Sequence, residues 1–271
     1  MIEILKKQFT ENMPLEEKLN RVREFLQIVA LKILYDKGIL NNLIFVGGTA
    51  LRVLYDIRRF SEDLDFSLLQ KKAYDFLELN NELVRGFKLY GFHVESNPRN
   101  KKEGAVYGTF LKFSGLLKDV GLSALSSQKL SIKLEIDTNP PKGGNLAATL
   151  VNKTYIINIT HFDLPSAFAT KLHACFYRKF TKGRDFYDFV WYMGRRIKPN
   201  YVLLNNAIEQ TQGSSPRLNE DNFREFLLKN IEEIDFNQAK KDVERFLEDK
   251  SELKFFDKKL IANSIESVYS V

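Results

Sequence analysis

Two aspartates one residue apart are the first candidates for chemistry in this sequence. Residues 63–66 read Asp-Leu-Asp-Phe. Side chains alternate between the two faces of a β-strand, so Asp63 and Asp65 would share one face while Leu64 and Phe66 face the core. Adjacent carboxylates repel each other, but a bound Mg²⁺ or Mn²⁺ would make the pair favourable, because hard cations prefer oxygen ligands. Taken alone, the pair is more typical of a solvated edge strand than of a metal site.

A second acidic strand shifts this balance towards a metal site. Residues 129–137, "KLSIKLEID", alternate in the same way, with Lys133, Glu135 and Asp137 on the polar face. Three carboxylates from two strands can hold a pair of metal ions that stabilise the attacking and leaving oxygens of a phosphoryl displacement. The third carboxylate could also take the proton from an attacking hydroxyl. Periodicity leaves the choice between Glu135 and Asp137 open, because both face the same way.

A Gly-Gly-Thr turn adds the groups that phosphates need. It follows the apolar residues 43–46 and precedes a predicted helix over residues 50–57. Gly47 and Gly48 allow close approach of the backbone, Thr49 adds a hydroxyl donor, and the helix start offers free N–H groups. Alone, such a turn often only connects a strand to a helix. Beside two acidic strands, it predicts a nucleotide site.

A third cluster combines cations and carboxylates further along the chain. On a helix, Lys171 and Arg178 lie seven residues apart and share a face that suits phosphate. The alternative is a solvated basic stripe. Asp185 and Asp188 also share a face, one turn apart. Here the alternative is that Asp185 stabilises a helix N-terminus and Asp188 forms a surface pair with Arg184.

Hydrophobic periodicity indicates the elements that must position these residues. We predict strands over residues 43–46, 63–68, 105–113, 129–137 and 154–160, and helices over residues 14–37, 50–57, 71–90, 166–180 and 185–196. From Asn219 to the end, the sequence is helical and charged. Because the character of the sequence changes after Pro165, we expect a mixed α/β core over residues 1–165 and a helical lobe over residues 166–271.

Composition narrows the classes of function. The chain has 271 residues and a net charge of +6, which favours polyanionic partners. A single cysteine, Cys175, excludes an intrachain disulfide framework and a cysteine-based zinc cluster. No apolar run in the sequence approaches the roughly 20 residues that span a bilayer, and the first residues lack the pattern of a signal peptide. We therefore expect a cytoplasmic protein without a membrane partner.

Together, these motifs resemble a known superfamily. Residues 47–51 (Gly-Gly-Thr-Ala-Leu), 59–66 (Arg-Phe-Ser-Glu-Asp-Leu-Asp-Phe) and 133–136 (Lys-Leu-Glu-Ile) resemble the DNA-polymerase-β-like nucleotidyltransferases. Residues 171–189 are similar to the Lys-x-x-Ala…Arg…Arg-Asp-x-x-Asp signature of the AbiEii/AbiGii toxin family within that superfamily. The resemblance implies an α/β (α+β) fold, in which a polymerase-β-like nucleotidyltransferase core with a mixed sheet is followed by a helical C-terminal lobe.

The resemblance also implies roles for single residues. The implied site comprises the metal ligands Asp63, Asp65 and Glu135, the nucleotide-binding residues Gly47, Gly48, Thr49, Ser61 and Lys171, and an essential acid, Asp185 or Asp188. Ser61 either contacts phosphate or simply starts the strand. The helical lobe would contribute Lys171 and Asp185 to the active site.

The resemblance implies metal-dependent transfer of a nucleoside monophosphate from an NTP to an acceptor hydroxyl. Members of the family are toxins of bacterial toxin–antitoxin or phage-abortive-infection systems, so a cognate antitoxin is expected, and tRNA 3′ ends are one acceptor class. The net positive charge favours RNA as the acceptor. The alternatives are a protein-modifying nucleotidyltransferase and a catalytically retired nucleotide- or RNA-binding module. Retired copies usually lose a carboxylate, whereas Asp63, Asp65 and Glu135 are all present.

Overall fold

The computed structural model describes residues 1–70, 74–98, 105–178 and 182–269. The chain forms two compact units. The first, which we call the sheet unit, comprises residues 1–56, 60–139 and 148–161. The second, the helical unit, comprises residues 57–59, 140–147 and 162–271. Three residues that precede the Asp-x-Asp strand in the sequence therefore belong to the helical unit.

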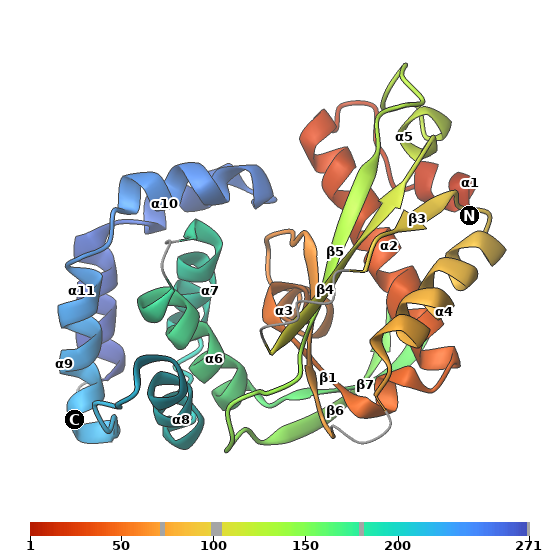
Figure 1. Ribbon diagram of the computed structural model, residues 1–271. Coiled ribbons are helices and arrows are strands. Elements are labelled where there is room, and N and C mark those ends of the chain that lie inside the picture. Colours follow the sequence, from red (N-terminus) through yellow and green to blue (C-terminus); the bar gives the residue numbers. More distant parts are fainter. Residues whose placement is uncertain (71–73, 99–104, 179–181, 270–271) are drawn as a thin grey trace. The chain divides into compact units, whose positions relative to one another are not determined.

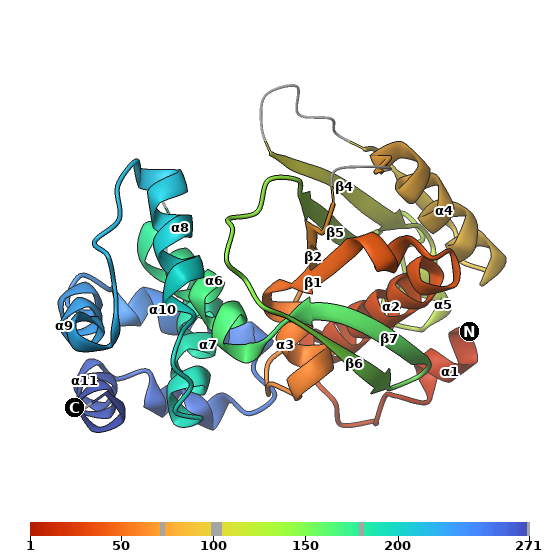
Figure 2. The same ribbon diagram turned by 90° about the horizontal axis from the view of Figure 1, so that it is seen from below.

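The sheet unit is built on a mixed, seven-stranded sheet (Figure 1). Its strands are β1 (Leu43–Val46), β2 (Asp63–Leu68), β3 (Val94–Ser96), β4 (Val106–Phe113), β5 (Leu130–Asp137), β6 (Leu146–Asn152) and β7 (Ile156–Phe162). Their order is β3-β4-β5-β2-β1-β7-β6, and Figure 2 shows β6 and β7 side by side at one end of it. The pairs β2–β5 and β1–β7 are parallel, whereas β1–β2, β3–β4 and β4–β5 are antiparallel. The prediction of a mixed sheet is confirmed.

Helices cover the apolar face of this sheet. The helical elements of the sheet unit are α1 (Ile2–Lys6), α2 (Leu15–Asp36), the 3₁₀-helix η1 (Ile39–Asn42), α3 (Gly47–Tyr55), α4 (Phe76–Leu89) and α5 (Leu116–Asp119). One cluster of buried apolar side chains joins α2 and α4 to the sheet. The long helix α2 ends as predicted, because Gly38 adopts a left-handed conformation with φ +69°.

Buried apolar residues of the two neighbouring strands β2 and β5 share one face. In β5 these are Ile132, Leu134 and Ile136, and in β2 they include Leu64 and Phe66. All five belong to the core cluster that α2 and α4 complete. The residues between them are only half-buried, so they lie on the opposite face, where the alternation of each strand places them.

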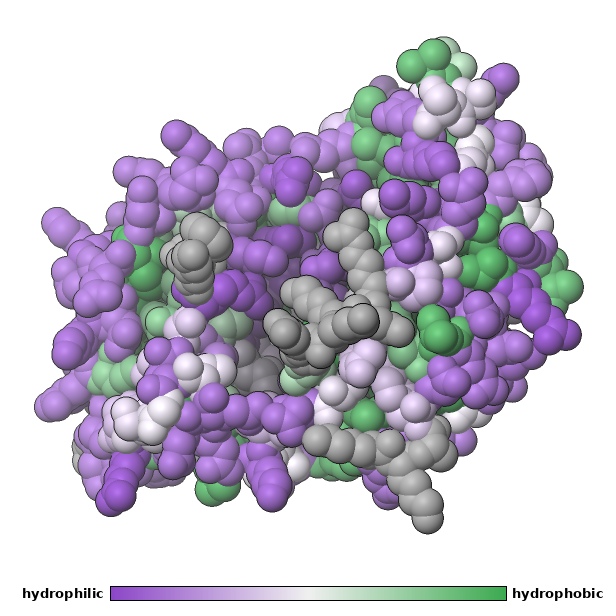
Figure 3. Space-filling model, in the orientation of Figure 1, coloured by the Kyte–Doolittle hydropathy of each residue, from purple (hydrophilic) through white to green (hydrophobic). Residues whose placement is uncertain are grey.

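The helical unit is held together largely by aromatic side chains. Its elements are α6 (Leu164–Tyr177), α7 (Gly183–Gly194), α8 (Tyr201–Gln212), α9 (Glu220–Ile231), α10 (Phe236–Val243), the 3₁₀-helices η2 (Glu244–Phe246) and η3 (Lys250–Phe255), and α11 (Lys258–Val268). Phe168 of α6 stacks on Tyr192 of α7, with ring centroids 4.5 Å apart. Over α9 to α11 the surface is mainly hydrophilic (Figure 3), as the charged C-terminal sequence predicts. Within the described ranges, no helix is both long and apolar enough to cross a membrane.

Some elements escape prediction from the sequence. These are β3, β6, α1, α5 and α8. In β6 only Val151 is fully buried, so the strand lacks the apolar alternation that would indicate it. The helices α1 and α5 are one turn long, too short for a periodic signal. Residues 71–73 and 179–180 of two predicted helices lie outside the described residues.

The Gly-Gly-Thr segment also differs from its prediction. We predict a turn followed by a helix over residues 50–57, whereas α3 begins at Gly47 and ends at Tyr55. The three residues therefore form the first turn of the helix. Gly47 makes this direct entry from β1 feasible, because its φ of +78° is a conformation that other residues rarely adopt.

Among the described glycines of the helical unit, Gly183 has the least room for a side chain. It opens α7, and its N–H donates to the Oδ2 of Asp242 at 2.7 Å. A Cβ built at this position would lie 1.9 Å from the carbonyl oxygen of Ala239 in α10. Backbone atoms cannot yield as a flexible side chain can, so α7 and α10 would have to separate.

We expect Gly183→Ala to lower the free energy of unfolding by about 2–3 kcal/mol, as overpacking does in well-packed interiors. Urea denaturation of the full chain measures this change. Gly194→Ala is the matched control, because Gly194 ends the same helix and a Cβ there meets nothing within 4 Å. Equal stability of the two variants would contradict the close approach of α10.

Candidate active site

The register of β2 and β5 decides which carboxylates are neighbours. Asp65 lies opposite Glu135, and Ser67 lies opposite Asp137, one pair further along. Asp63 shares a face with Asp65, because the two are separated by one residue of the same strand. The structure therefore brings Glu135 next to the Asp-x-Asp pair and places Asp137 one step away, a choice that periodicity left open.

Small residues surround this row of carboxylates. Gly108 of β4 lies opposite Glu135, and a Cβ there would approach the Cγ of Glu135 to 3.7 Å. At Gly47, a Cβ would lie 2.5 Å from the Oδ2 of Asp65. Because that distance is too short for any real contact, only glycine at position 47 leaves room for the Asp65 carboxylate.

The first turn of α3 has backbone N–H donors and one hydroxyl that is already hydrogen-bonded within the protein. Val46, the residue before the helix, has no side-chain acceptor, so it cannot cap the N–H groups of Gly48 and Thr49. Thr49 is fully buried, and its hydroxyl donates to the backbone carbonyl of Asp63. The sequence predicts this hydroxyl as a phosphate donor, but its hydrogen is used inside the protein. What Thr49 can offer a phosphate is its backbone N–H.

The donor set and the strand register suit a hard divalent cation. The side chains as they stand do not form a three-ligand group, since no three His, Cys, Asp or Glu residues within the described ranges are placed to hold a metal ion. One reason is that Glu135 is bound elsewhere, since its Oε2 pairs with the Nζ of Lys133 at 2.7 Å. A cation bound by all three carboxylates would have to draw Glu135 away from Lys133.

In the helical unit, the predicted Lys and Asp residues meet in one buried ionic network. The Nζ of Lys171 lies 2.7 Å from the Oδ1 of Asp185 and 2.7 Å from the Oδ2 of Asp188. Arg59 binds Asp188 through two hydrogen bonds of 2.6 Å each. Arg178 donates to the Oδ2 of Asp185 at 2.8 Å. We call these five residues the ionic network.

Mutual attraction keeps Lys171 and Asp185 charged despite burial. Burial by itself lowers the pKa of Lys171, but the carboxylates of Asp185 and Asp188 outweigh it and raise that pKa above its ordinary value. Burial likewise raises the pKa of Asp185, but Lys171 and Arg178 outweigh it and bring that pKa below its ordinary value. The network pairs three basic side chains with two acidic ones.

This arrangement excludes a solvated stripe at Lys171 and a surface pair at Asp188, whereas Asp185 does lie in the first turn of α7. Lys171 is 8% exposed, so it does not belong to a solvated stripe. Asp188 is fully buried and bound to Lys171 and Arg59, so it is not part of a surface pair with Arg184. The predicted shared helix face of Lys171 and Arg178 is wrong in detail. Helix α6 ends at Tyr177, and Arg178 reaches Asp185 from an extended backbone conformation.

Comparison with known protein families gives a clear result. The model of the family described as "Nucleotidyl transferase AbiEii toxin, Type IV TA system" matches residues 30–262. The chain belongs to the AbiEii family. The matched range contains the Asp-x-Asp strand, the strand with Glu135 and all five members of the ionic network.

Two solved structures share the fold of this AbiEii family member. The crystal structure of JHP933 from Helicobacter pylori has 18% sequence identity and a TM-score of 0.53, covering 92% of this chain and 90% of that one. A candidate nucleotidyltransferase from H. pylori has 17% identity and a TM-score of 0.52, covering 91% and 93%. At such identities the likeness shows the fold alone. No curated protein matches the chain.

Two residues at the candidate sites make contacts that nothing in the sequence indicates. Arg59 lies inside the motif at residues 59–66, but its partner Asp188 is 129 residues away. Gln27 donates from α2 to the carbonyl of Ser61, 34 residues later. Ser61 itself is buried and lies just before β2, which begins at Asp63. Neither contact follows a local rule, so only the folded chain reveals them.

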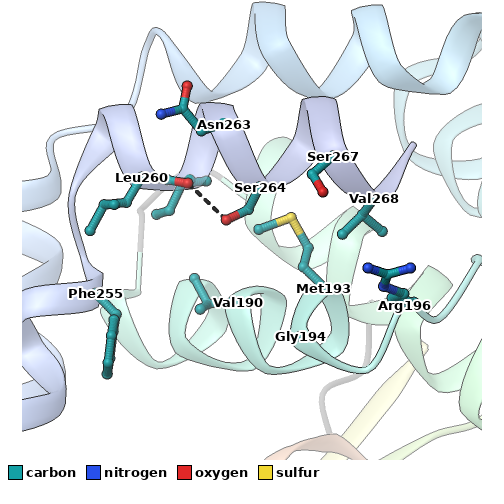
Figure 4. A pocket seen from close by; sticks show the side chains of 11 residues that line it. Val190, Met193, Gly194, Arg196, Phe255, Leu260, Asn263, Ser264, Ser267 and Val268 are labelled. Atoms are coloured by element: carbon teal, nitrogen blue, oxygen red, sulfur yellow. Dashed lines mark hydrogen bonds between the residues drawn. The ribbon is translucent and has the colours of Figure 1, made fainter. Parts of the chain in front are cut away.

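The AbiEii family member also has a pocket of about 460 Å³ between α7, η3 and α11 (Figure 4). Its lining residues are Val190, Met193, Gly194, Arg196, Phe255, Leu260, Ile261, Asn263, Ser264, Ser267 and Val268. None of these described residues carries a carboxylate, and none is a predicted site residue. The pocket therefore offers no carboxylate to a hard cation, and the candidate chemistry lies elsewhere.

The Arg59–Asp188 pair yields a stability prediction. Arg59→Met should lower the free energy of unfolding by about 3–5 kcal/mol, because Asp188 would remain buried after losing the guanidinium that binds it. A double-mutant cycle with Asp188→Leu measures the coupling of the pair. The loss of unfolding free energy in the double variant should be smaller, by at least about 1 kcal/mol, than the sum of the losses in the two single variants. Lys198→Ala is the control, since its pair with Glu220 is exposed and should contribute little. Additive losses would contradict the coupling.

The lowered pKa of Asp185 predicts how stability depends on pH. In the folded state this carboxyl releases its proton more readily than in the unfolded chain, where an aspartate has a pKa of about 3.9. Its contribution to stability is therefore full above about pH 4 and is lost as the pH falls through the lower folded value. We expect Asp185→Asn to be less stable at pH 7 and to lose less stability below pH 4. Parallel acid-denaturation curves for the two proteins would contradict this.

Proposed function

We propose that this AbiEii family member transfers a nucleoside monophosphate from an NTP to an acceptor hydroxyl in a reaction that depends on Mg²⁺ or Mn²⁺. The observation that carries the proposal is the register of β2 and β5, which sets Glu135 beside Asp65. Asp63 lies on the same face, opposite the core. Membership of a family of nucleotidyl transferase toxins supports the reaction class.

Asp63, Asp65 and Glu135 would be the metal ligands in this reaction. The bound cation would neutralise charge on the triphosphate and polarise the α-phosphate. The backbone N–H groups of Gly48 and Thr49 would bind phosphate oxygens at the positive end of α3. Glycine at position 47 would keep the Asp65 carboxylate and this helix start close together.

The chemical step is an exchange of one P–O bond for another. The acceptor hydroxyl oxygen bonds to the α-phosphorus, and the bond from that phosphorus to the bridging oxygen breaks, so that pyrophosphate leaves. Glu135 would accept the hydroxyl proton, because it is the carboxylate beside the Asp-x-Asp pair.

We propose that Lys171 binds the nucleotide, as its place in the Lys-x-x-Ala…Arg…Arg-Asp-x-x-Asp signature implies. Asp185 and Asp188 hold its ammonium group in place. Of the two acids, Asp185 is better placed than Asp188 to act near a ligand. Its partner Arg178 is 42% exposed, whereas Asp188 is fully buried.

We further propose that the acceptor is the 3′ end of an RNA, in particular a tRNA, and that the enzyme acts in the bacterial cytoplasm, where RNA and NTPs occur together. The net charge of +6 supports a polyanionic acceptor. The type IV toxin–antitoxin assignment of the family supports a role as a toxin with a cognate antitoxin.

The test incubates purified protein with Mg²⁺, each α-labelled NTP in turn, total cellular RNA and a protein lysate. Label in a tRNA-sized band would support the proposal and identify the NTP. Label in a protein band would instead identify a protein-modifying nucleotidyltransferase. No label with any NTP would contradict nucleotidyl transfer to the RNA and protein acceptors supplied.

The strand register makes a sharper prediction for the same assay. Glu135→Gln should reduce transfer to background, because it removes a metal ligand and the proton acceptor. Asp137→Asn is the matched control, since Asp137 lies on the same strand face but opposite Ser67 and accepts from the N–H of Asn139. It should keep its rate within about threefold. The reverse result would make Asp137 the third carboxylate.

A further inference from the structure

Gln27 is a buried polar residue in an apolar stretch of α2. Residues 25–31 read Phe-Leu-Gln-Ile-Val-Ala-Leu, and Gln27 is 1% exposed. Burying an amide without partners costs several kcal/mol on water-to-hydrocarbon scales, so a glutamine here needs hydrogen bonds. An apolar residue of similar size would fill the same space in the core without needing hydrogen bonds. The reason for glutamine must therefore lie in what its amide contacts.

Both contacts of the Gln27 amide go to the segment that leads into β2. Its Nε2 donates to the carbonyl of Ser61 at 3.0 Å and makes a longer contact of 3.4 Å with the carbonyl of Asp63. Ser61 lies outside any helix or strand. An NH₂ group has two hydrogens, so each carbonyl can receive one.

Thr49 binds the same segment from a second element. Its buried hydroxyl donates to the carbonyl of Asp63, the oxygen that Gln27 also contacts. Donors from α2 and α3 therefore hold the peptide group that follows the Asp63 side chain. Because that peptide group is fixed, the direction of the Asp63 side chain and the start of the strand carrying Asp65 are fixed with it.

We propose that Gln27 and Thr49 are positioning residues that hold Asp63 and Asp65 in the geometry that binds a divalent cation, an inference that rests on the proposed function. Both donors are neutral. A lysine or arginine could also donate to these carbonyls, but its positive charge would repel the cation that the carboxylates bind. The neutral donors fix the backbone and leave the negative charge of the carboxylates unaltered.

The experiment measures Mn²⁺ binding to the full chain without nucleotide, by titration followed with electron paramagnetic resonance. Gln27→Leu removes both amide donors at nearly constant volume, and Thr49→Val removes the hydroxyl. Each should weaken Mn²⁺ binding about tenfold, the lower end of the effect of groups that orient metal ligands. In the transfer assay, kcat should fall while the KM for NTP stays nearly constant.

Asn80→Leu is the matched control. Asn80 is also a buried amide of the sheet unit, 3% exposed, but its Nδ2 donates to Ser96 of β3, the strand at the far end of the sheet order. It should lose thermal stability without a change in Mn²⁺ affinity. If Gln27→Leu does not fold, as judged by near-ultraviolet circular dichroism, Thr49→Val decides the question.

The outcomes separate this inference from the proposed function. If the wild-type protein binds Mn²⁺ and the folded variants bind it equally well, the inference is overturned and the proposed function stands. If the variants lose affinity no more than Asn80→Leu does, their role is merely structural and the inference is again overturned. If the wild-type protein binds no Mn²⁺, both fail together.

Discussion

Burial of one face of β2 and β5 decides where the other groups of the carboxylate site must lie. Ile132, Leu134 and Phe66 are sealed beneath α2 and α4, and moving them to solvent would cost several kcal/mol. Because side chains alternate along a strand, the same burial commits Asp65 and Glu135 to the opposite face. A slip of one residue in the register would bury carboxylates and expose apolar side chains. Burial of the apolar face thus places the carboxylates side by side even though they repel each other.

The helical unit handles its charges differently. There the carboxylates are buried, and each is bound by two cations, so that none of the five groups of the ionic network is left uncompensated in a region of low dielectric. Full burial of Asp188 restricts it to holding Arg59 and Lys171. Arg59 lies four residues before Asp63 in the sequence, a separation of at most about 14 Å along an extended chain. The network therefore fixes Arg59 within the helical unit, to which residues 57–59 belong.

Local rules explain which parts of this molecule its sequence predicts. The strands at residues 63–68 and 129–137 are predicted correctly, because apolar and polar residues alternate there and only one face is buried. That pattern also predicts the shared face of the carboxylates, but it cannot choose Glu135 over Asp137, since the choice depends on how two strands are aligned. Contacts such as Arg59–Asp188 and Gln27–Ser61 join distant residues without any periodic signal. Glutamine in an amphipathic helix and arginine before a strand are both ordinary surface residues, so their burial could not be foreseen.

Lys133 limits how the carboxylate face can bind a cation. It lies opposite Asp63 across the β2–β5 pair, and its Nζ pairs with the Oε2 of Glu135 at 2.7 Å. Under the proposed function, a cation that reaches Glu135 must displace this ammonium group, because two positive charges at one carboxylate repel each other. Lys133 would therefore act as the counter-ion of Glu135 until the cation binds.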